Sequence, residues 1–388
     1  MNDFEFCVGT DILFGRNQLE KLPAVMGQYG KKILMVYGGG SIKRTGLYDR
    51  VKNVLKDFQV FELGGVEPNP RTTTIEKGIR ICRENAVDML LAVGGGSTID
   101  CAKSIAAGVF YDGHVWDMVL GAGQGTITKA LPVCTVLTIA ATGSEMDPAA
   151  VVSNMDTKEK LTMIHPALLP KCSVLEPENT FTVPARQTAA GSADIMSHVM
   201  EVYFGSEDTF LTDRICEAIL KTVIHFAPLA LKEPNNYEAR ANLMWASSLG
   251  LNGLCNAGKA HDWSCHYIEH ELSAYYDITH GVGLAIVTPR WMRHILSDKT
   301  VGKFADFAVN VWGLPADMDK QELAEKGIDA LEQFFSGLGI PMTLREVGIT
   351  DEHFEEMAQH ALAFTGIGSI SYAPLGQEDI VKILRACL

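Results

Sequence analysis

The stretch Met89-Leu-Leu-Ala-Val-Gly-Gly-Gly-Ser-Thr-Ile-Asp100 decides the fold class, because it joins an apolar run, a glycine turn and the start of a helix. Met89–Val93 is apolar throughout and has the length of a strand that is buried on both faces of a sheet. The three glycines follow directly, and Thr98–Ala107 then has the pattern of a helix. A buried strand, a turn and a helix in this order predict a βαβ unit of a parallel sheet.

The two halves of the chain differ in their patterns. Three further apolar runs in the first half resemble strands, and amphipathic segments separate them. The runs are Ile33–Tyr37, Val60–Leu63 and Pro132–Leu137, and the amphipathic segments include Leu47–Lys56 and Thr74–Glu84. From Pro184 onward only helical patterns remain, at Thr188–Phe204, Asp213–Leu231, Tyr237–Leu251, Trp263–Tyr276 and Gln321–Leu338. We therefore expect an α/β domain with a parallel sheet over residues 1–183 and an all-helical domain over residues 184–388.

Composition excludes several classes of protein. The 388 residues include 47 acidic and 33 basic side chains, a formal net charge of −14, which argues against binding to nucleic-acid phosphates. The N-terminal residues lack the pattern of a secretory signal, and no run approaches the roughly 18 apolar residues of a membrane span. The nine cysteines are scattered without a Cys-x-x-Cys pair, which is typical of thiols in a reducing compartment. We expect a cytoplasmic protein that binds neither nucleic acid nor a membrane.

The glycine turn at Gly94–Ser97 is suited to a phosphate ligand. Glycine lets a ligand lie against the backbone, and the free N–H groups at the start of the next helix favour a pyrophosphate. The alternative is an ordinary turn, and the spacing does not match the G-x-G-x-x-G fingerprint. From the residues alone, both interpretations stay open.

A second glycine turn, Tyr37-Gly-Gly-Gly-Ser-Ile-Lys-Arg44, follows an earlier expected strand. Dinucleotide sites often carry an acid here, which binds the ribose 2′-hydroxyl. This turn has Gly, Ser and nearby cations instead, and these suit a 2′-phosphate better. The alternative is again a plain turn with Lys43 and Arg44 in solvent.

Histidines and an aspartate recur at helical spacing in the second half. Asp194 and His198 are four residues apart, as are His266 and His270, so each pair shares one face of its helix. His280 follows just before another expected helix. Any one of these histidines is more often an ordinary hydrogen-bonded residue, but the whole set indicates a site for a catalytic divalent metal.

The segment His266-Tyr-Ile-Glu-His270 also spells H-x-x-E-H, the motif of inverzincin peptidases. In that interpretation both histidines bind zinc and Glu269 activates water. It leaves Asp194, His198 and the two glycine turns without a role.

Specific motifs extend over essentially the whole chain: Ile12-Leu-Phe-Gly15, Tyr37-Gly-Gly-Gly-Ser-Ile-Lys43, Gly65-Val-Glu-Pro-Asn-Pro70, Gly94-Gly-Gly-Ser97 with Asp100, Ala141-Thr-Gly-Ser-Glu145, Thr188-Ala-Ala-Gly191 with Asp194 and His198, and His266 through Gly281. On these motifs the chain resembles the iron-containing (group III) alcohol dehydrogenases, and within them the bacterial NAD(P)H-dependent butanol dehydrogenase branch. The resemblance implies an N-terminal dinucleotide-binding domain and a helical metal-binding domain. It also implies interconversion of butanol-like primary alcohols and aldehydes with NADP(H) or NAD(H), Fe²⁺ or Zn²⁺ as the metal, and a homodimer.

Site residues follow from the resemblance, motif by motif. It implies that the metal ligands are Asp194, His198, His266 and His280, and that His270 is a catalytic residue beside the nicotinamide. Gly39, Gly40 and Ser41 would face the adenosine 2′ position. Gly95, Gly96 and Ser97 would meet the pyrophosphate, with Asp100 supporting the turn. The rest of the cofactor groove would be lined by Asn69, Thr138, Thr142, Asp147 and Lys160, where Asp147 replaces the Asn of some NADPH-using relatives.

Two further functions compete with this one. A glycerol-type dehydrogenase or a dehydroquinate-synthase-like lyase would share the fold, but a phosphorylated substrate needs several Lys or Arg near the metal. Few occur between Thr188 and Gly281, where aromatic and apolar residues are more evident. A non-catalytic nucleotide- or metal-binding protein would be indicated by loss of a ligand, and all four are present.

Overall fold

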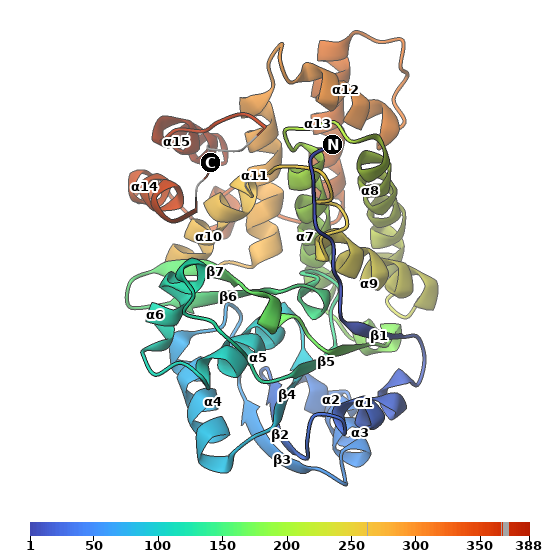
Figure 1. Cartoon of the computed structure of the whole chain (residues 1–388). Helices are drawn as coiled ribbons and strands as arrows, with labels where there is room; N and C mark the ends of the chain where they lie inside the picture. Colours follow the sequence, from blue (N-terminus) through green and yellow to red (C-terminus); the bar gives the residue numbers. More distant parts are fainter. Residues whose placement is uncertain (262, 366, 368–371) are drawn as a thin grey trace. The chain divides into compact units, whose positions relative to one another are not determined.

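The structure, a computed structural model, describes residues 1–261, 263–365, 367 and 372–388 (Figure 1). Two units make up the chain. The sheet unit comprises Cys7–Val183 and Pro234–Ser248, and the helical unit comprises Met1–Phe6, Pro184–Glu233 and Leu249–Leu388.

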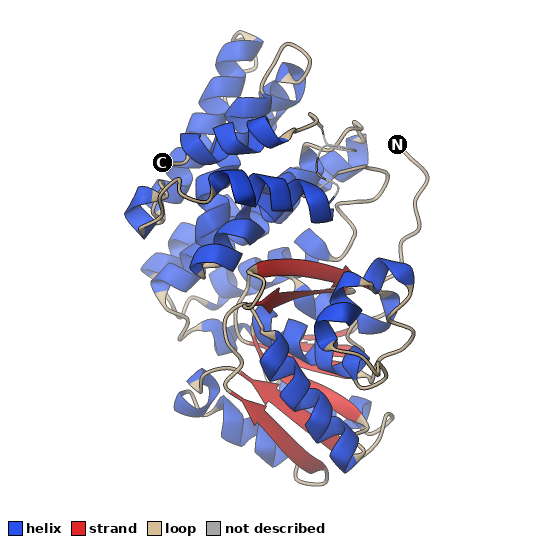
Figure 2. Cartoon of the chain, turned by 90° about the vertical axis from the view of Figure 1, so that its left-hand side faces the viewer, coloured by secondary structure: helices blue, strands red, loops and turns tan. Residues whose placement is uncertain are grey.

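A parallel sheet of six strands forms the centre of the sheet unit, in the order β1-β8-β5-β4-β2-β3 (Figure 2). The strands are β1 (Asp11–Phe14), β2 (Lys32–Tyr37), β3 (Gln59–Gly64), β4 (Met89–Gly94), β5 (Val133–Leu137) and β8 (Cys172–Leu175). The expected fold class and the four strands expected from apolar runs, β2 to β5, are confirmed.

Helices cover both faces of this sheet. They are α1 (Leu22–Met26), α2 (Ser41–Arg44), α3 (Leu47–Val54), α4 (Thr72–Asn85), α5 (Gly96–Gly108) and α6 (Val115–Leu120). Because successive strand residues point to opposite faces, Leu34 and Val36 join a core with α4, α5 and α6. Ile33 and Met35 join a second core with α1 and α3 on the other face. This double burial explains why β2 and β4 read as continuous apolar runs.

The sequence did not predict β1, β8 or a two-stranded antiparallel hairpin of β6 (Ala149–Asn154) and β7 (Glu159–Ile164). The two sheet strands have only four residues each, and the hairpin strands Ala-Ala-Val-Val-Ser-Asn and Glu-Lys-Leu-Thr-Met-Ile mix apolar and polar residues without a continuous apolar run of strand length. The hairpin packs on α5, and Ser153 forms an isolated bridge with Arg71.

Helix α9 (Tyr237–Leu251) lies mainly in the sheet unit, although it is part of the sequence expected to form the helical domain. Its Ser247 hydroxyl accepts hydrogen bonds from the backbone N–H groups of Ala141 and Gly143, at 3.1 and 3.2 Å. Ser248 next to it donates to the buried carboxylate of Glu145. The two units therefore differ from the expected domains at two segments: Pro234–Ser248 belongs to the sheet unit, and Met1–Phe6 belongs to the helical unit.

The remaining α-helices belong to the helical unit: α7 (Ala185–Tyr203), α8 (Phe210–Lys232), α10 (Ser264–Tyr276), α11 (His280–Ile295), α12 (Val301–Asn310), α13 (Lys320–Gly337), α14 (Phe354–Thr365) and α15 (Gln377–Ala386). Four of them, α7, α8, α10 and α13, were expected from the sequence. Helix α7 packs against α8, α10 and α11 (Figure 1). A Cβ atom on Gly281 would lie 2.0 Å from the Ala190 carbonyl oxygen, so glycine is what lets α11 approach α7 this closely.

In the part of the chain that the structure describes, no helix is long and apolar enough to span a membrane.

Candidate functional site

Helix α7 places Asp194 and His198 one turn apart in its buried middle. The first half of the helix contains the small residues Thr188-Ala-Ala-Gly-Ser-Ala193, which allow its neighbours to pack closely. Asp194 is 3% exposed and His198 is 6% exposed. An ionisable pair buried to this degree needs partners that offset the loss of hydration.

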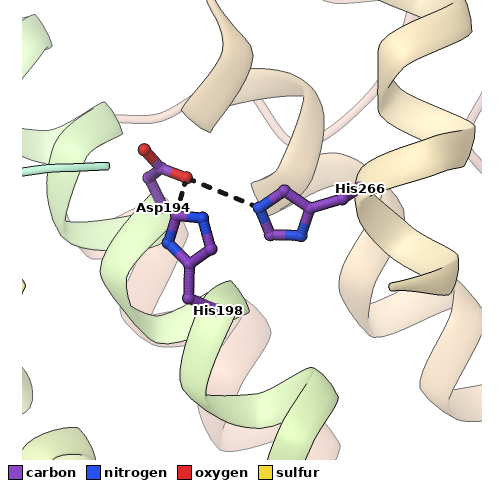
Figure 3. Close-up of side chains that lie close together, drawn as sticks. All are labelled: Asp194, His198 and His266. Carbon is purple, nitrogen blue, oxygen red and sulfur yellow. Dashed lines mark ion pairs between the residues drawn. The ribbon is translucent and has the colours of Figure 1, made fainter. Parts of the chain in front are cut away.

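Helix α10 brings His266 to the same carboxylate oxygen, as Figure 3 shows, and α11 brings His280. Asp194 Oδ1 lies 3.6 Å from His198 Nδ1, 3.8 Å from His266 Nε2 and 3.7 Å from His280 Nε2. The structure thus gathers all four expected metal ligands around one oxygen, although they are spread over 87 positions of the sequence, counted from 194 to 280.

Two atoms at the centre of this group lack an ordinary hydrogen-bond partner within the described residues. Asp194 Oδ1 and His266 Nε2 are both buried and unpaired. The distances of 3.6 Å or more between the carboxylate and the imidazoles are too long for hydrogen bonds. One carboxylate oxygen and three imidazole nitrogens that lie this close together form a donor set that fits Zn²⁺ or Fe²⁺.

The electrostatics of the group also favour a cation. Burial opposes ionisation of Asp194, yet the surrounding histidines lower its pKa below the usual range. Burial lowers the pKa of His198 to about 3, so this imidazole is neutral and has a lone pair to donate. Burial also acts against the charged form of His266, but the carboxylates of Glu201 and Asp194 raise its pKa to about 9.

His270 lies on α10 one turn after His266 and is 4% exposed. Its ring centre is 6.5 Å from that of His266 and 5.6 Å from that of His280. Ligand atoms of Glu269, His270 and His280 lie within 4.8 Å of one another. His270 therefore borders two of the expected ligands, His266 and His280.

In the sheet unit, the turn from β4 into α5 brings together most of the residues expected to bind a cofactor. A Cβ atom on Gly95 would lie 2.4 Å from Ile139, and one on Gly96 would lie 2.5 Å from Thr142. The backbone N–H of Asn69 donates to Ser97 Oγ at 3.3 Å. The backbone N–H of Thr138 donates to the Gly94 carbonyl at 3.0 Å, so these residues meet at the carboxyl end of β4.

Lys160 joins this group through the hairpin. It lies on β7 opposite Ser153 of β6, and the Ser153 backbone N–H donates to the carbonyl of Pro70, next to Asn69. Lys160 is 4% exposed, so its side chain is held inside the sheet unit.

Asp100 and Asp147 belong to a buried hydrogen-bond network around Lys103, a residue for which the sequence predicted no role. Lys103 is fully buried, and its Nζ lies 2.6 Å from Asp147 Oδ1 and 3.0 Å from Ser144 Oγ. Ser144 in turn donates to Asp100 Oδ1 at 2.6 Å. Burial raises the pKa of Asp100 to about 6 and also raises that of Asp147. Both aspartates therefore support the turn, and a direct contact of Asp147 with a cofactor stays a prediction.

The turn after β2 is open. A Cβ atom on Gly39 or Gly40 would meet no atom within 4 Å, and Gly40 has a φ of 95°, which favours glycine. Ser41 begins α2. The Lys43 ammonium lies 5.0 Å from the centre of the Tyr37 ring and 4.9 Å from that of Tyr48, where cation–π attraction holds it.

Family models match nearly the whole chain. Residues 9–177 match the model of iron-containing alcohol dehydrogenase, and residues 188–388 match the C-terminal model of the Fe-containing alcohol dehydrogenase family. The chain belongs to the iron-containing alcohol dehydrogenase family. The resemblance expected from the motifs is therefore confirmed.

Individual members of the iron-containing alcohol dehydrogenase family are similar over their full length. The NADH-dependent butanol dehydrogenase A of Clostridium acetobutylicum is 53% identical over 388 residues, which cover 99% of each chain. The NADPH-dependent aldehyde reductase YqhD of Escherichia coli is 39% identical over 90% of each chain. The crystal structure of the NADH-dependent butanol dehydrogenase A of Thermotoga maritima has a TM-score of 0.95 and 37% identity, and the match covers 100% of this chain and 99% of that one.

Sequence reasoning missed two buried carboxylates of this iron-containing alcohol dehydrogenase. Glu201 contacts His266 Nδ1, and Glu269 contacts His280 Nδ1. The helical spacing contains a signal for the first, because Glu201 follows Asp194 by seven residues and so shares its face of α7. The dehydrogenase interpretation of the sequence gave Glu269 no role, and this contact corrects it.

Proposed function

We propose that the chain is an NAD(P)H-dependent oxidoreductase that interconverts butanol-like primary alcohols and aldehydes, with a divalent metal held by Asp194, His198, His266 and His280. The observation that carries the proposal is the convergence of three imidazole nitrogens on the unpaired, buried Asp194 Oδ1. The names of the relatives support the reaction, and those names include both NADH-dependent and NADPH-dependent enzymes.

The donor set suits Fe²⁺ and Zn²⁺, and the family's name supports iron. A divalent metal, when bound, lowers the pKa of an alcohol and polarises an aldehyde carbonyl. Asp194 would supply the negative charge that offsets a buried cation, and each histidine would contribute one ring nitrogen.

The nicotinamide cofactor, when bound, accepts or donates the hydride. In the sheet unit, Gly95, Gly96 and Ser97 at the start of α5 offer backbone N–H groups and a close approach for its pyrophosphate. Gly39, Gly40 and Ser41 lie in the open turn after β2, where we place the adenosine 2′ position. We place the rest of the cofactor beside Asn69, Thr138, Thr142, Asp147 and Lys160.

His270 is the residue that we assign to proton transfer. Its imidazole borders His266 and His280, and an imidazole can carry a proton to and from an alcohol near neutral pH. In this role it would hold the proton that the alcohol loses on oxidation and return it on aldehyde reduction.

The peptidase interpretation of H-x-x-E-H requires Glu269 to act as a base beside two zinc-binding histidines. Instead, Glu269 contacts His280 and accepts a hydrogen bond from Ser273, and it is fully buried. A carboxylate that is held on both oxygens in this way is not placed to activate water, so the geometry favours the dehydrogenase.

Assembly and location are further parts of the proposal. We expect a homodimer, on the basis of the resemblance to the family. A cytoplasmic location is supported by the cysteines, of which Cys7 is exposed and the other eight are buried, with no disulfide among them in the residues that the structure describes.

The direct test is an assay of the purified enzyme with butanal, using NADPH and NADH in parallel, with the metal content measured on the same sample. We expect reduction of butanal that depends on bound iron or zinc and is lost on chelation. Full activity in metal-free protein, or hydrolysis of peptides by the metal-loaded protein, would contradict the proposal.

A further inference from the structure

Buried glutamates contact the Nδ1 nitrogens of two proposed metal ligands, His266 and His280. Glu201 Oε1 accepts a hydrogen bond from His266 Nδ1, and Glu269 Oε2 accepts one from His280 Nδ1. Glu201 is 4% exposed and Glu269 is 0% exposed. Burying a carboxylate costs free energy unless it is paired, so each glutamate needs its histidine partner in the folded protein.

The contacts form a chain through three helices. Asp194, His198 and Glu201 share one face of α7, and Glu201 reaches across to His266 on α10. Glu269 lies one turn after His266, and it reaches across to His280 at the start of α11. Helix α7 thus supplies the carboxylate that contacts the histidine of α10, and α10 supplies the one that contacts the histidine of α11.

Glu201 is itself fixed by the start of α10. Its Oε2 accepts the backbone N–H groups of Cys265 and His266 at 2.8 and 3.2 Å, and its Oε1 accepts the Ser197 hydroxyl at 3.0 Å. Backbone donors leave this carboxylate little freedom to rotate.

Glu269 is fixed by a hydroxyl and by close packing. Ser273, one turn further along α10, donates to its Oε1. A Cβ atom on Gly283 would lie 2.6 Å from Glu269 Cγ and 2.9 Å from its Oε1, so the backbone of α11 lies directly against this side chain. No larger residue fits at position 283 unless Glu269 moves.

The contacts determine which imidazole nitrogen is available. A carboxylate at Nδ1 keeps the proton on that nitrogen, and the lone pair is then on Nε2. His266 Nε2 and His280 Nε2 are the atoms that face Asp194 Oδ1, at 3.8 and 3.7 Å. The glutamates therefore orient both rings toward the proposed metal position before any metal binds.

We propose that Glu201 and Glu269 are positioning residues that pre-organise His266 and His280 for the metal and raise the affinity of the site. This inference rests on the proposed ligand set. Removing an interaction of this kind typically lowers metal affinity by about 10–100-fold.

The test is the dissociation constant of Zn²⁺ for the full chain, measured by chelator competition on metal-free protein. Glu269→Met is the first variant, because it removes the acceptor of His280 Nδ1, whereas the oxygen of a Gln could keep that contact. The Ser273 hydroxyl can still donate to the Ile278 carbonyl, which lies 3.5 Å away. We expect about 10–100-fold weaker Zn²⁺ binding, with a cooperative thermal transition of the metal-free protein to show that it is folded. The matched control is Glu271→Met, at a buried glutamate on the same helix that pairs with His360 at 3.6 Å, and it should keep wild-type affinity.

A second variant covers the case in which Glu269→Met does not fold. Ser273→Ala removes one anchor of Glu269 and should weaken Zn²⁺ binding by a smaller factor. Wild-type affinity in whichever of the two variants folds would overturn the proposal. A separate result would show that the proposed ligand set is wrong: His280→Ala would then bind Zn²⁺ as tightly as the wild type.

Discussion

Two buried carboxylates, Asp147 in the sheet unit and Asp194 in the helical unit, differ in what neutralises them. Asp147 has a lysine of the same chain, Lys103, at 2.6 Å, and that lysine also donates to two carbonyls and a hydroxyl. Among the described residues, Asp194 Oδ1 has imidazole nitrogens at 3.6 Å or more and no hydrogen-bond partner. The first cluster is complete without a ligand, whereas the second has the donors that suit a metal cation.

The comparison separates support from binding. Lys103, Asp147 and Asp100 tie α5 to the segment 144–151, so they hold the backbone of the glycine turns in place. Around Asp194, the glutamates contact Nδ1 of two histidines, whose Nε2 atoms face Asp194 Oδ1. A carboxylate whose charge is already matched indicates a structural role, and an unmatched one indicates a site.

Removing the unmatched carboxylate should have the largest effect. Asp194→Ala, or His266→Ala, should reduce metal affinity by more than about 100-fold, because a ligand contributes more than a residue behind it. Turnover should fall with the metal content. Elemental analysis that finds full metal occupancy in both variants would contradict the assignment.

His270 tests the edge of the metal group. Because His270 borders His266 and His280 but is not one of the four proposed ligands, we expect His270→Ala to keep its metal and to lose turnover by about 10–100-fold, with an altered pH profile. Metal content and kcat measured on the same preparation decide this. A metal-free His270→Ala protein would support the H-x-x-E-H interpretation instead.

Gly39 tests the open turn of the sheet unit. The space beside it is empty, so Gly39→Asp introduces a carboxylate without a clash. That charge should repel a 2′-phosphate and lower kcat/KM for NADPH by about tenfold, while NADH is affected less. An unchanged kcat/KM for NADPH would show that Gly39 does not face the 2′ position.

Glu145 offers a smaller, pH-dependent effect. Burial raises its pKa to about 7, so the folded protein holds this proton more tightly than the unfolded chain. Stability contributed by the protonated form is then lost as the pH rises from about 4.5 through about 7. Glu145→Gln keeps the acceptor for Ser248 and should gain about 1–3 kcal/mol relative to the wild type between about pH 5 and pH 8.

Thermal unfolding of the metal-free proteins at the two pH values measures this gain. Asp156→Asn, in the exposed turn between β6 and β7, is the control and should show none. A Glu145→Gln variant whose stability relative to the wild type does not depend on pH would mean that the carboxyl is not protonated by burial.

Much of the fold could be predicted from local patterns. The strands β2 and β4 are buried on both faces, which makes Ile33–Tyr37 and Met89–Val93 continuous apolar runs. The hairpin strand β7 could not be predicted in this way, because Glu159–Ile164 has a buried lysine and an exposed isoleucine and so lacks a continuous apolar run. The place of α9 depends on hydrogen bonds to residues about 100 positions away, and no local pattern contains these.

The candidate site shows the same limit. Asp194 with His198 and His266 with His270 could be found because helical spacing is visible in the sequence. Glu201 and Glu269 could not be assigned, since each acts on a histidine of another helix. Lys103 was missed because its apolar neighbours gave no sign of the carboxylate that it meets inside the sheet unit.

The central claim is that the metal lies among Asp194, His198, His266 and His280. Anomalous diffraction from crystals of the purified enzyme, recorded at the absorption edge of the metal that it contains, tests this most directly. We expect one peak at about 2.0–2.2 Å from an Asp194 oxygen and from one nitrogen of each of the three histidines. A peak held by His266 and His270 and remote from Asp194 and His198 would contradict the account.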